Sequence, residues 1–264
     1  MLWVEFEYKD KYDVDDLVRI VRILRSPNGC PWDKVQTHQT IRQDFIEEVY
    51  EAVEAIDEND TEHLKEELGD VLLQVVFHCV LEEEKGNFDL ADAANDVCQK
   101  MILRHPHVFG NIKADTPEEV LANWDRIKME SKDQKSSGES MESISKTLPS
   151  LMRAEKLNKK AERAGLPSEA PNRIIDDISK QLEELKGDIS ENKTECCEER
   201  IGDILFLMTG LSRVVNVESE NSLYNACGRF IEHFKEFEEN AKRSGVNIQN
   251  ASPETVRAVW EGKK

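Results

Sequence analysis

The chain of 264 residues carries 54 acidic and 35 basic side chains, and its formal net charge is -19. This charge argues against binding of long nucleic acid, which needs a basic surface to contact phosphates. Because the chain has no run of about 18 apolar residues and no basic segment leading into an apolar stretch at its start, we expect neither a membrane helix nor a signal peptide. Six cysteines without Cys-x-x-Cys spacing predict reduced thiols and, by default, a cytoplasmic protein.

Helical periodicity with few strand signals predicts an all-α fold, and two helices between residues 45 and 79 are the clearest elements. The polar stretch between them, residues 57–62, predicts a turn centred on Asn59 with Thr61 as the N-cap of the second helix. Apolar positions at helical spacing form one face of each helix: Phe45, Val49, Ala52, Val53 and Ile56 in the first, and Leu64, Leu68, Leu72, Val75 and Cys79 in the second.

Acidic residues form a separate stripe on this hairpin. Residues three and four apart share a helix face, so Glu47, Glu48 and Glu51 lie together on the first helix, and Glu67 and Asp70 on the second. Level residues of an antiparallel hairpin have numbers with a constant sum, and the pairs 51 with 67 and 48 with 70 share one sum. Four carboxylates are therefore expected to face each other in two level rungs.

The negative charge of such a cluster must be neutralised in part, because like charges about 4 Å apart repel by roughly 4 kcal/mol at an effective dielectric constant of about 20. Protonation of some acids or binding of a cation would relieve the repulsion. Carboxylate oxygens are ligands that suit Mg²⁺ or Mn²⁺. The alternative is a solvated acidic face on a surface hairpin.

A weak self-similarity at an offset of 133 residues predicts a second, diverged copy of the hairpin at residues 175–207. The apolar pattern persists there, but half of the rung carboxylates are lost. Residues 131–146, rich in Ser, Lys, Asp and Glu, predict a flexible linker between domains at 1–130 and 147–264. The acidic positions correspond as Glu47 to Lys180, Glu48 to Gln181, Glu51 to Glu184, Glu67 to Arg200, and Asp70 to Asp203.

Several motifs in this order resemble the MazG family of nucleoside triphosphate pyrophosphohydrolases, and the resemblance covers nearly the whole chain. They are the segment Leu-Arg-Ser-Pro-Asn-Gly-Cys-Pro-Trp-Asp at 24–33, Gln-Thr-His at 36–38, Glu-Glu-Leu-Gly-Asp at 66–70, Arg-His-Pro-His-Val-Phe-Gly at 104–110, and the second-half segment 146–157. The resemblance implies two tandem helix-bundle domains of an all-α homodimer that uses Mg²⁺ to convert a nucleoside triphosphate to the monophosphate and pyrophosphate.

The resemblance also implies roles for residues of the first copy. The family's metal-ligand positions match Glu48, Glu51, Glu67 and Asp70, and Glu47 is an adjacent carboxylate that could orient or deprotonate water. The departures at Lys180, Gln181 and Arg200 put a working site in the second copy in doubt.

Candidate substrate contacts lie on both sides of the hairpin. Trp32 could stack on a base while Asp33, Gln36 or His38 bonds to base or sugar edges, although core packing of Trp32 is equally compatible. Two further candidates, Lys100 and Arg104, share a face of a helix expected from about Asp89. They would contact phosphates or, alternatively, serve as surface charge near a helix C-terminus. His78 is interpreted as structural.

These expectations combine into a predicted enzyme that acts through the first hairpin. A pyrophosphohydrolase of another nucleotide, such as a phosphoribosyl nucleotide or an alarmone, and a non-catalytic nucleotide-binding regulatory module remain alternatives. A homodimer or higher oligomer is expected because a two-helix unit cannot bury both sides of its apolar stripes, unless the two copies pack on each other.

Overall fold

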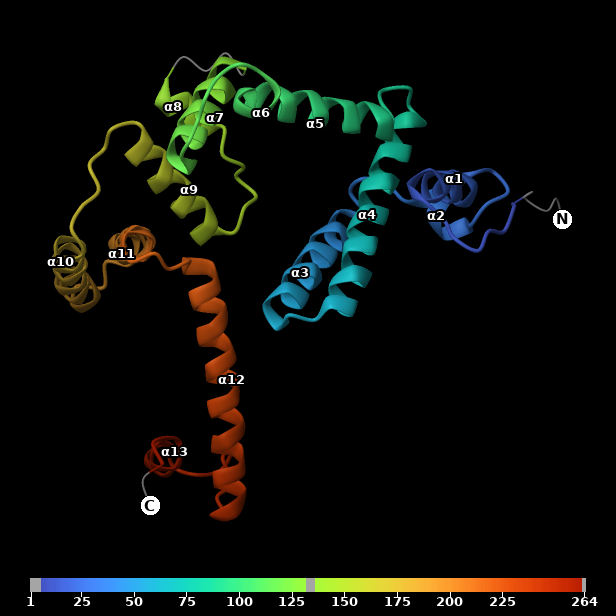
Figure 1. Cartoon of the computed structure of the whole chain (residues 1–264). Coiled ribbons are helices and arrows are strands. Elements are labelled where there is room, and N and C mark those ends of the chain that lie inside the picture. The colour runs from blue at the N-terminus through green and yellow to red at the C-terminus, as the bar shows by residue number, and fades with distance from the viewer. Residues whose placement is uncertain (1–5, 132–135, 263–264) are drawn as a thin grey trace. The chain divides into compact units, whose positions relative to one another are not determined.

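The structure is a computed structural model that describes residues 6–131 and 136–262 (Figure 1). Within these residues all regular elements are helices, which confirms the all-α prediction. None of the described helices is both long and apolar enough to cross a membrane. They are α1 (Val14–Arg25), α2 (Pro31–Val35), α3 (Arg42–Glu58), α4 (Thr61–Glu83), α5 (Leu90–Arg104), α6 (Pro106–Phe109), α7 (Pro117–Ser131), α8 (Ser137–Glu142), α9 (Ser150–Arg163), α10 (Pro171–Ser190), α11 (Thr194–Val214), α12 (Ser219–Arg243) and α13 (Pro253–Trp260).

The chain divides into two compact units, residues 1–128 and 129–264. Part of the segment predicted as a flexible linker is ordered: α8 forms at 137–142 with Ser136 as its N-cap, and Ile144 is buried. The side chain of Lys160 in α9 donates to Ser140, which ties α8 to its neighbour. The predicted linker thus contains a helix at 137–142, and its residues 132–135 lie outside the described part of the chain.

In the first unit, α3 and α4 form the predicted antiparallel hairpin. Asn59, in the left-handed conformation with φ of 57°, ends α3 and reverses the chain. The prediction of Thr61 as N-cap is wrong by one residue: the side chain of Asp60 accepts hydrogen bonds from the backbone N–H groups of Glu62 and His63. A carboxylate is as good an acceptor here as a hydroxyl, and it also suits the positive end of the helix dipole.

The core of the first unit lies between α1 and the C-terminal half of α4. Side chains of Val21 and Val76 are fully buried there, surrounded by Val18, Ile41, Phe77, Val80 and Leu81. In contrast, the N-terminal half of the hairpin buries mainly the small residues Ala52 and Ala55 of α3.

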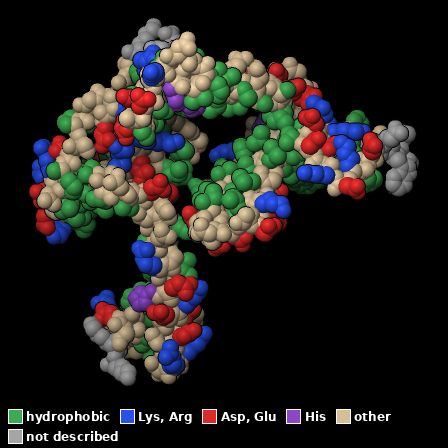
Figure 2. Space-filling view, in the orientation of Figure 1, with side chains coloured by type: hydrophobic (Ala, Val, Ile, Leu, Met, Phe, Trp, Pro, Cys, Tyr) green, Lys and Arg blue, Asp and Glu red, His purple; other side chains and the backbone are tan. Residues whose placement is uncertain are grey.

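Part of the apolar face predicted for the hairpin is exposed. Val49, Val53, Ile56 and Leu68 each leave more than two fifths of their surface accessible. Hydrophobic side chains gather over α3 and α4 in the space-filling view (Figure 2). Two helices can cover each other only along one line of contact, so the flanking apolar residues have no cover within this unit.

The second unit also contains a pair of consecutive helices joined by a short turn. Its helices, α10 and α11, are joined through Asn192, which has φ of 56° and lies 133 residues after Asn59. Helix α11 begins at Thr194, the counterpart of Thr61 at the same offset. Leu182, Ile189 and Ile201 are exposed at the positions that correspond to Val49, Ile56 and Leu68.

Candidate functional site

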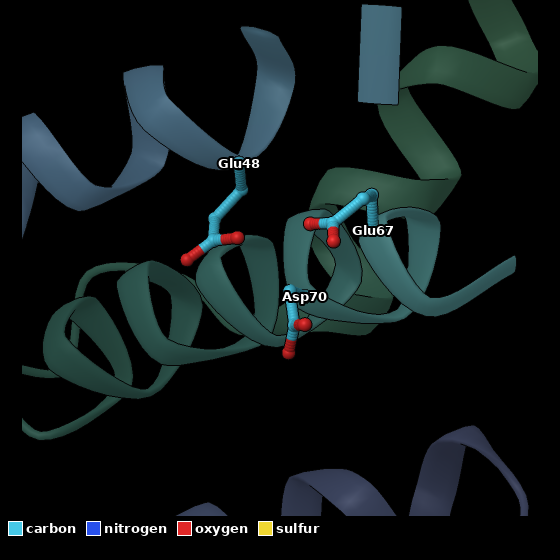
Figure 3. Close-up of side chains that lie close together, drawn as sticks. All are labelled: Glu48, Glu67 and Asp70. Carbon is cyan, nitrogen blue, oxygen red and sulfur yellow. The ribbon is translucent and has the colours of Figure 1, made fainter. Parts of the chain in front are cut away.

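Three carboxylates converge between the helices of the first hairpin (Figure 3). Glu48 projects from α3, and Glu67 and Asp70 project from α4. One oxygen atom of each lies within 4.8 Å of the others. Glu67 is buried, and the other two are half-buried. The level pair of Glu48 and Asp70 is therefore in contact range, as the helix register predicts.

Burial and neighbouring negative charge raise the pKa of two of these carboxylates, Glu48 and Glu67. Burial, followed by the negative charge of Asp70, raises the pKa of Glu48 above its ordinary value. Burial, followed by the charge of Glu51, raises the pKa of Glu67, while His63 acts in the opposite direction. Both shifts mean that a positive charge in the cluster would stabilise the ionised acids.

Glu51 and Glu47 lie at the edge of this cluster. Glu51 is exposed, and its charge contributes to the raised pKa of both Glu48 and Glu67. Glu47 is exposed and accepts a hydrogen bond of 3.2 Å from Gln43 Nε2, one turn earlier on α3. Of the five predicted acids, the structure therefore gathers Glu48, Glu67 and Asp70.

His63 is a neighbour of the cluster that the sequence analysis missed. Its Nε2 lies 3.1 Å from Oε1 of Glu67, one turn along α4. The signal for this contact was present, because histidine and glutamate four residues apart on a helix share a face.

Three predicted substrate-contact residues, Trp32, Asp33 and Gln36, lie in α2 and directly after it. Trp32 is 59% exposed, so the core-packing alternative does not hold. Gln36 uses its side chain locally: Nε2 donates to the Trp32 carbonyl at 3.0 Å, and Oε1 accepts from Thr40. The backbone carbonyl of Asp33 accepts a hydrogen bond from Arg25.

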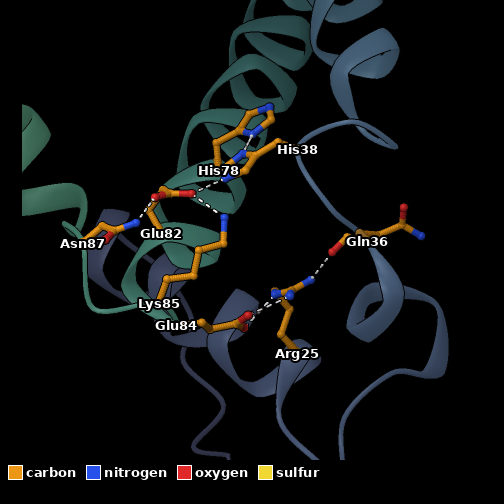
Figure 4. A network of polar contacts seen from close by, with 8 residues as sticks. All are labelled: Arg25, Gln36, His38, His78, Glu82, Glu84, Lys85 and Asn87. Atoms are coloured by element: carbon orange, nitrogen blue, oxygen red, sulfur yellow. Dashed lines mark hydrogen bonds and ion pairs between the residues drawn. The ribbon is translucent and has the colours of Figure 1, made fainter.

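His38 is held in a network with residues of α4 (Figure 4). Its Nδ1 lies 2.7 Å from Nδ1 of His78, and its Nε2 lies 2.5 Å from Oε1 of Glu82. The same glutamate accepts from Lys85 and Asn87 at 2.6 Å each. Both ring nitrogens of His38 are therefore engaged within the protein, and His78 has the structural role that the sequence predicts.

Lys100 and Arg104 occupy α5, and their environments differ. Lys100 is exposed. Arg104 is buried with its guanidinium 5.3 Å from the ring centroid of Trp124, and its Nε finds no hydrogen-bond partner among the described residues. Contacts in the described residues connect neither of them to the carboxylates of the hairpin.

The corresponding place in the second hairpin holds a cation of the protein itself. Arg200, at the position of Glu67, bonds to Glu184 and to Asp188, and its Nη1 donates to Gln181 at 3.1 Å. Glu184, the first partner, keeps the acid that corresponds to Glu51. The second partner, Asp188, lies at the position of buried Ala55.

The donor set of the first cluster fits a hard divalent cation. All its ligand atoms are carboxylate oxygens from two helices. Burial first, and then the charge of neighbouring acids, raises the pKa of Glu48 and Glu67, and a bound cation would offset both effects. In the second hairpin, the guanidinium of Arg200 already supplies the compensating charge, so those residues do not fit a metal.

Comparison with known proteins agrees with these features. Residues 36–109, which include the acidic hairpin, match the model of the MazG nucleotide pyrophosphohydrolase domain. The chain is 39% identical, over 95% of both chains, to the nucleoside triphosphate pyrophosphohydrolase/pyrophosphatase MazG of Thermotoga maritima. It is 35% identical, over 95% of its own length and 97% of the relative, to the nucleoside triphosphate pyrophosphohydrolase of Escherichia coli K12.

A third similar protein, the uncharacterized protein YabN of Bacillus subtilis, is 43% identical over 93% of this chain but extends to about twice the matched length, since the match covers 50% of it. Together with the close similarity along almost the entire length of the Thermotoga and Escherichia proteins, these matches establish that the chain belongs to the MazG family.

Proposed function

We propose that this protein hydrolyses nucleoside triphosphates to the monophosphate and pyrophosphate, with Mg²⁺ or Mn²⁺ as cofactor, through the α3–α4 hairpin. The observation that carries the proposal is the convergence of Glu48, Glu67 and Asp70, with oxygens within 4.8 Å of one another. The names of the Thermotoga and Escherichia relatives support the substrate class.

Each acid has a role in this proposal. Glu48, Glu67 and Asp70, joined by Glu51, would hold the divalent cation, which when bound offsets the negative charge that develops on the phosphate oxygens. Burial of Glu67 strengthens its interaction with a cation, because less water screens the charge. Glu47, at the exposed edge of the cluster, would accept the proton of the attacking water.

The rest of the substrate needs contacts outside the cluster. The exposed ring of Trp32 would stack on the base. Lys100 and Arg104 would contribute positive charge toward the phosphates, and Arg104 has a buried Nε still available for a hydrogen bond.

We also propose that the protein works in the cytoplasm. All six cysteines, among them buried Cys79 and exposed Cys98, are free thiols in the structure. Persistent free thiols are typical of a reducing compartment.

Product analysis tests the proposed reaction. Purified protein would be incubated with a panel of ribonucleoside and deoxyribonucleoside triphosphates and Mg²⁺, and pyrophosphate and orthophosphate would be measured separately. We expect pyrophosphate in equal amount to the monophosphate and no turnover in excess chelator. Release of orthophosphate with a diphosphate product, or full activity without divalent cations, contradicts the proposal. Turnover confined to another pyrophosphate-bearing nucleotide would change the substrate class.

A further inference from the structure

The segment of residues 32–38, which we call the Trp32 segment, lacks a hydrophobic anchor. Helix α2 has only five residues, and none of its side chains is buried. Its start is set by a sharp turn at Gly29, where an added Cβ would lie 2.2 Å from the carbonyl oxygen of Leu24, so other residues do not fit. Beyond that turn, polar contacts must hold the segment in place.

Arg25 makes the first of these contacts from the end of α1. Its Nε and Nη2 bind both carboxylate oxygens of Glu84, at 2.7 and 2.8 Å. Its Nη1 donates to the backbone carbonyls of Asp33 and Gln36, at 2.5 and 3.2 Å. The guanidinium also lies 5.2 Å from the ring centroid of Phe77. The planar, forked guanidinium therefore joins the backbone of the Trp32 segment to the C-terminal end of α4.

His38 makes the second contact, at the other end of the segment. One ring nitrogen faces His78 and the other faces Glu82, whose second oxygen is held by Asn87. The two imidazole rings are nearly parallel, with an interplanar angle of 6°. Since both nitrogens are engaged, His38 has no free polar atom for a base or a sugar.

Both contacts end at the C-terminal part of α4, where Glu84 is the C-cap (Figure 4). The same helix carries Glu67 and Asp70 of the carboxylate cluster. Glu67 and His78 are separated by eleven residues of α4, about three helical turns, so they share a face about 16 Å apart along the helix. A continuous α-helix is a rigid spacer. Its geometry sets the separation between the acids that would hold the phosphates and the segment that carries Trp32.

We propose that Arg25 and His38 are positioning residues that hold the Trp32 segment at a set distance from the carboxylate cluster, so that the Trp32 ring meets the base when the phosphates are at Glu67 and Asp70. This inference rests on the proposed function. It reassigns His38 from a direct substrate contact to a residue that acts through Trp32.

Steady-state kinetics of full-length variants test the inference. Arg25→Lys keeps the positive charge but loses the forked geometry, and His38→Leu removes both ring contacts. We expect each to raise KM for the nucleoside triphosphate by about tenfold, the effect of losing a charge-assisted hydrogen bond, with kcat within about twofold of wild type. His38→Gln, which can still reach one partner, should recover part of the loss.

Arg22→Lys is the matched control. Arg22 also joins α1 to the end of α4, through Glu83, but it makes no contact with the Trp32 segment. Its KM should equal that of the wild type. Helical circular dichroism and melting curves would show that each variant folds. If Arg25→Lys does not fold, the KM values of His38→Leu and His38→Gln test the positioning role.

A double-mutant cycle with Trp32→Ala separates positioning from general stability. If His38 acts through Trp32, His38→Leu should add nothing to the KM of Trp32→Ala. An additive increase, an unchanged KM in Trp32→Ala, or wild-type KM values for the Arg25 and His38 variants overturns the inference. The proposed hydrolysis at the α3–α4 hairpin stands apart from these outcomes, because pyrophosphate release tests it separately, although an unchanged KM in Trp32→Ala would also remove the proposed base stacking. A wild-type protein that releases no pyrophosphate overturns both.

Discussion

At the residue scale, Asp70 offers a direct test of where the chemistry takes place, because the chain contains its own control. Asp203 lies at the same position of the second hairpin, where Arg200 takes the place of Glu67. We expect Asp70→Asn to lower kcat by more than about 100-fold, since even residues behind metal ligands can contribute 10- to 100-fold. Asp203→Asn should leave kcat unchanged.

The measurement is the initial rate of pyrophosphate release at saturating Mg²⁺, with circular dichroism to confirm that both variants remain helical. Comparable losses in the two variants would show that both hairpins take part in turnover. Retention of most of the rate in Asp70→Asn would refute the assignment of the cluster as the active site.

His78 and Glu82 predict a dependence of stability on pH. Burial and the neighbouring His38 lower the pKa of His78 below its ordinary value of 6.5. The unfolded chain therefore takes up this proton first, and the stability contributed by neutral His78 is complete above pH 6.5 and declines as the pH falls below it. Hydrogen bonds from Lys85, Asn87 and His38 lower the pKa of Glu82 to about 2, so its contribution is present above about pH 4.5 and is lost as the pH falls toward 2.

Between pH 7.5 and 5.5 only the histidine effect should therefore operate. The expected result is that wild type loses its advantage in melting temperature over His78→Phe as the pH falls through this range. The replacement ring can still pack near Phe45, which lies 5.4 Å from His78 between ring centroids. His233→Phe controls for the loss of one titrating histidine. A constant difference between wild type and His78→Phe would contradict the expectation.

At the element scale, the two hairpins show how closely local chemistry specifies geometry. Asn59 and Asn192 both adopt positive φ values, as residues without a bulky branched side chain can, and both end a long helix. The offset of 133 residues, read from the apolar pattern, therefore agrees with the positions of the turns. The N-cap was placed one residue late because Asp60 and Thr61 are both good caps, and only the backbone geometry selects Asp60.

Arg200 is expected to stabilise the second hairpin without metal. Arg200→Met leaves Asp188, which is buried at 9% exposure, without its cationic partner, and we expect the melting temperature to fall by about 5 °C. Adding Asp188→Ala should restore much of the loss, because the first hairpin has Ala55 at this position.

Lys186→Met is the control on α10, since that lysine forms only an exposed pair with Glu183 in the described contacts. Differential scanning calorimetry in chelator gives the comparison. If Arg200→Met melts with the wild type, or Asp188→Ala deepens the loss, the ion pair does not have this role.

At the scale of the whole molecule, the exposed apolar residues of both hairpins predict association. Leu68 on α4 and Ile201 on α11 are both about half exposed, at 53% and 49%. Uncovered apolar side chains at helical spacing are typical of surfaces that pair with another helix pair. Light scattering should therefore report a multiple of the 30.3 kDa chain mass at low micromolar concentration.

Leu68→Lys should shift this protein toward the monomer, because burial of a lysine in an apolar contact is unfavourable. Leu166→Lys, at an exposed leucine between α9 and α10, is the control and should keep the mass of the wild type. A monodisperse, active wild-type monomer would exclude a required oligomer.

The sequence by itself determined the two helices of the acidic hairpin, the turn at Asn59 and the register that brings Glu48 level with Asp70. These depend on interactions within a few residues, namely helical periodicity, capping and the spacing of positions on one face. The sequence also shows that Arg200 replaces Glu67 in the second copy. Because residues of an antiparallel hairpin whose numbers share a sum are neighbours, this places a positive charge among the remaining acids.

Only the tertiary structure decided which side chains are covered and which polar groups meet across elements. In the structure the guanidinium of Arg104 lies over the ring of Trp124, and Arg200 bonds to Asp188. Both ring nitrogens of His38 contact side chains of α4. It also left Val49, Val53, Ile56 and Leu68 of the hairpin exposed. Such contacts depend on how whole helices pack against each other. When a neighbouring helix covers only one line of a helix surface, some apolar residues of the same periodic pattern are buried and others stay exposed.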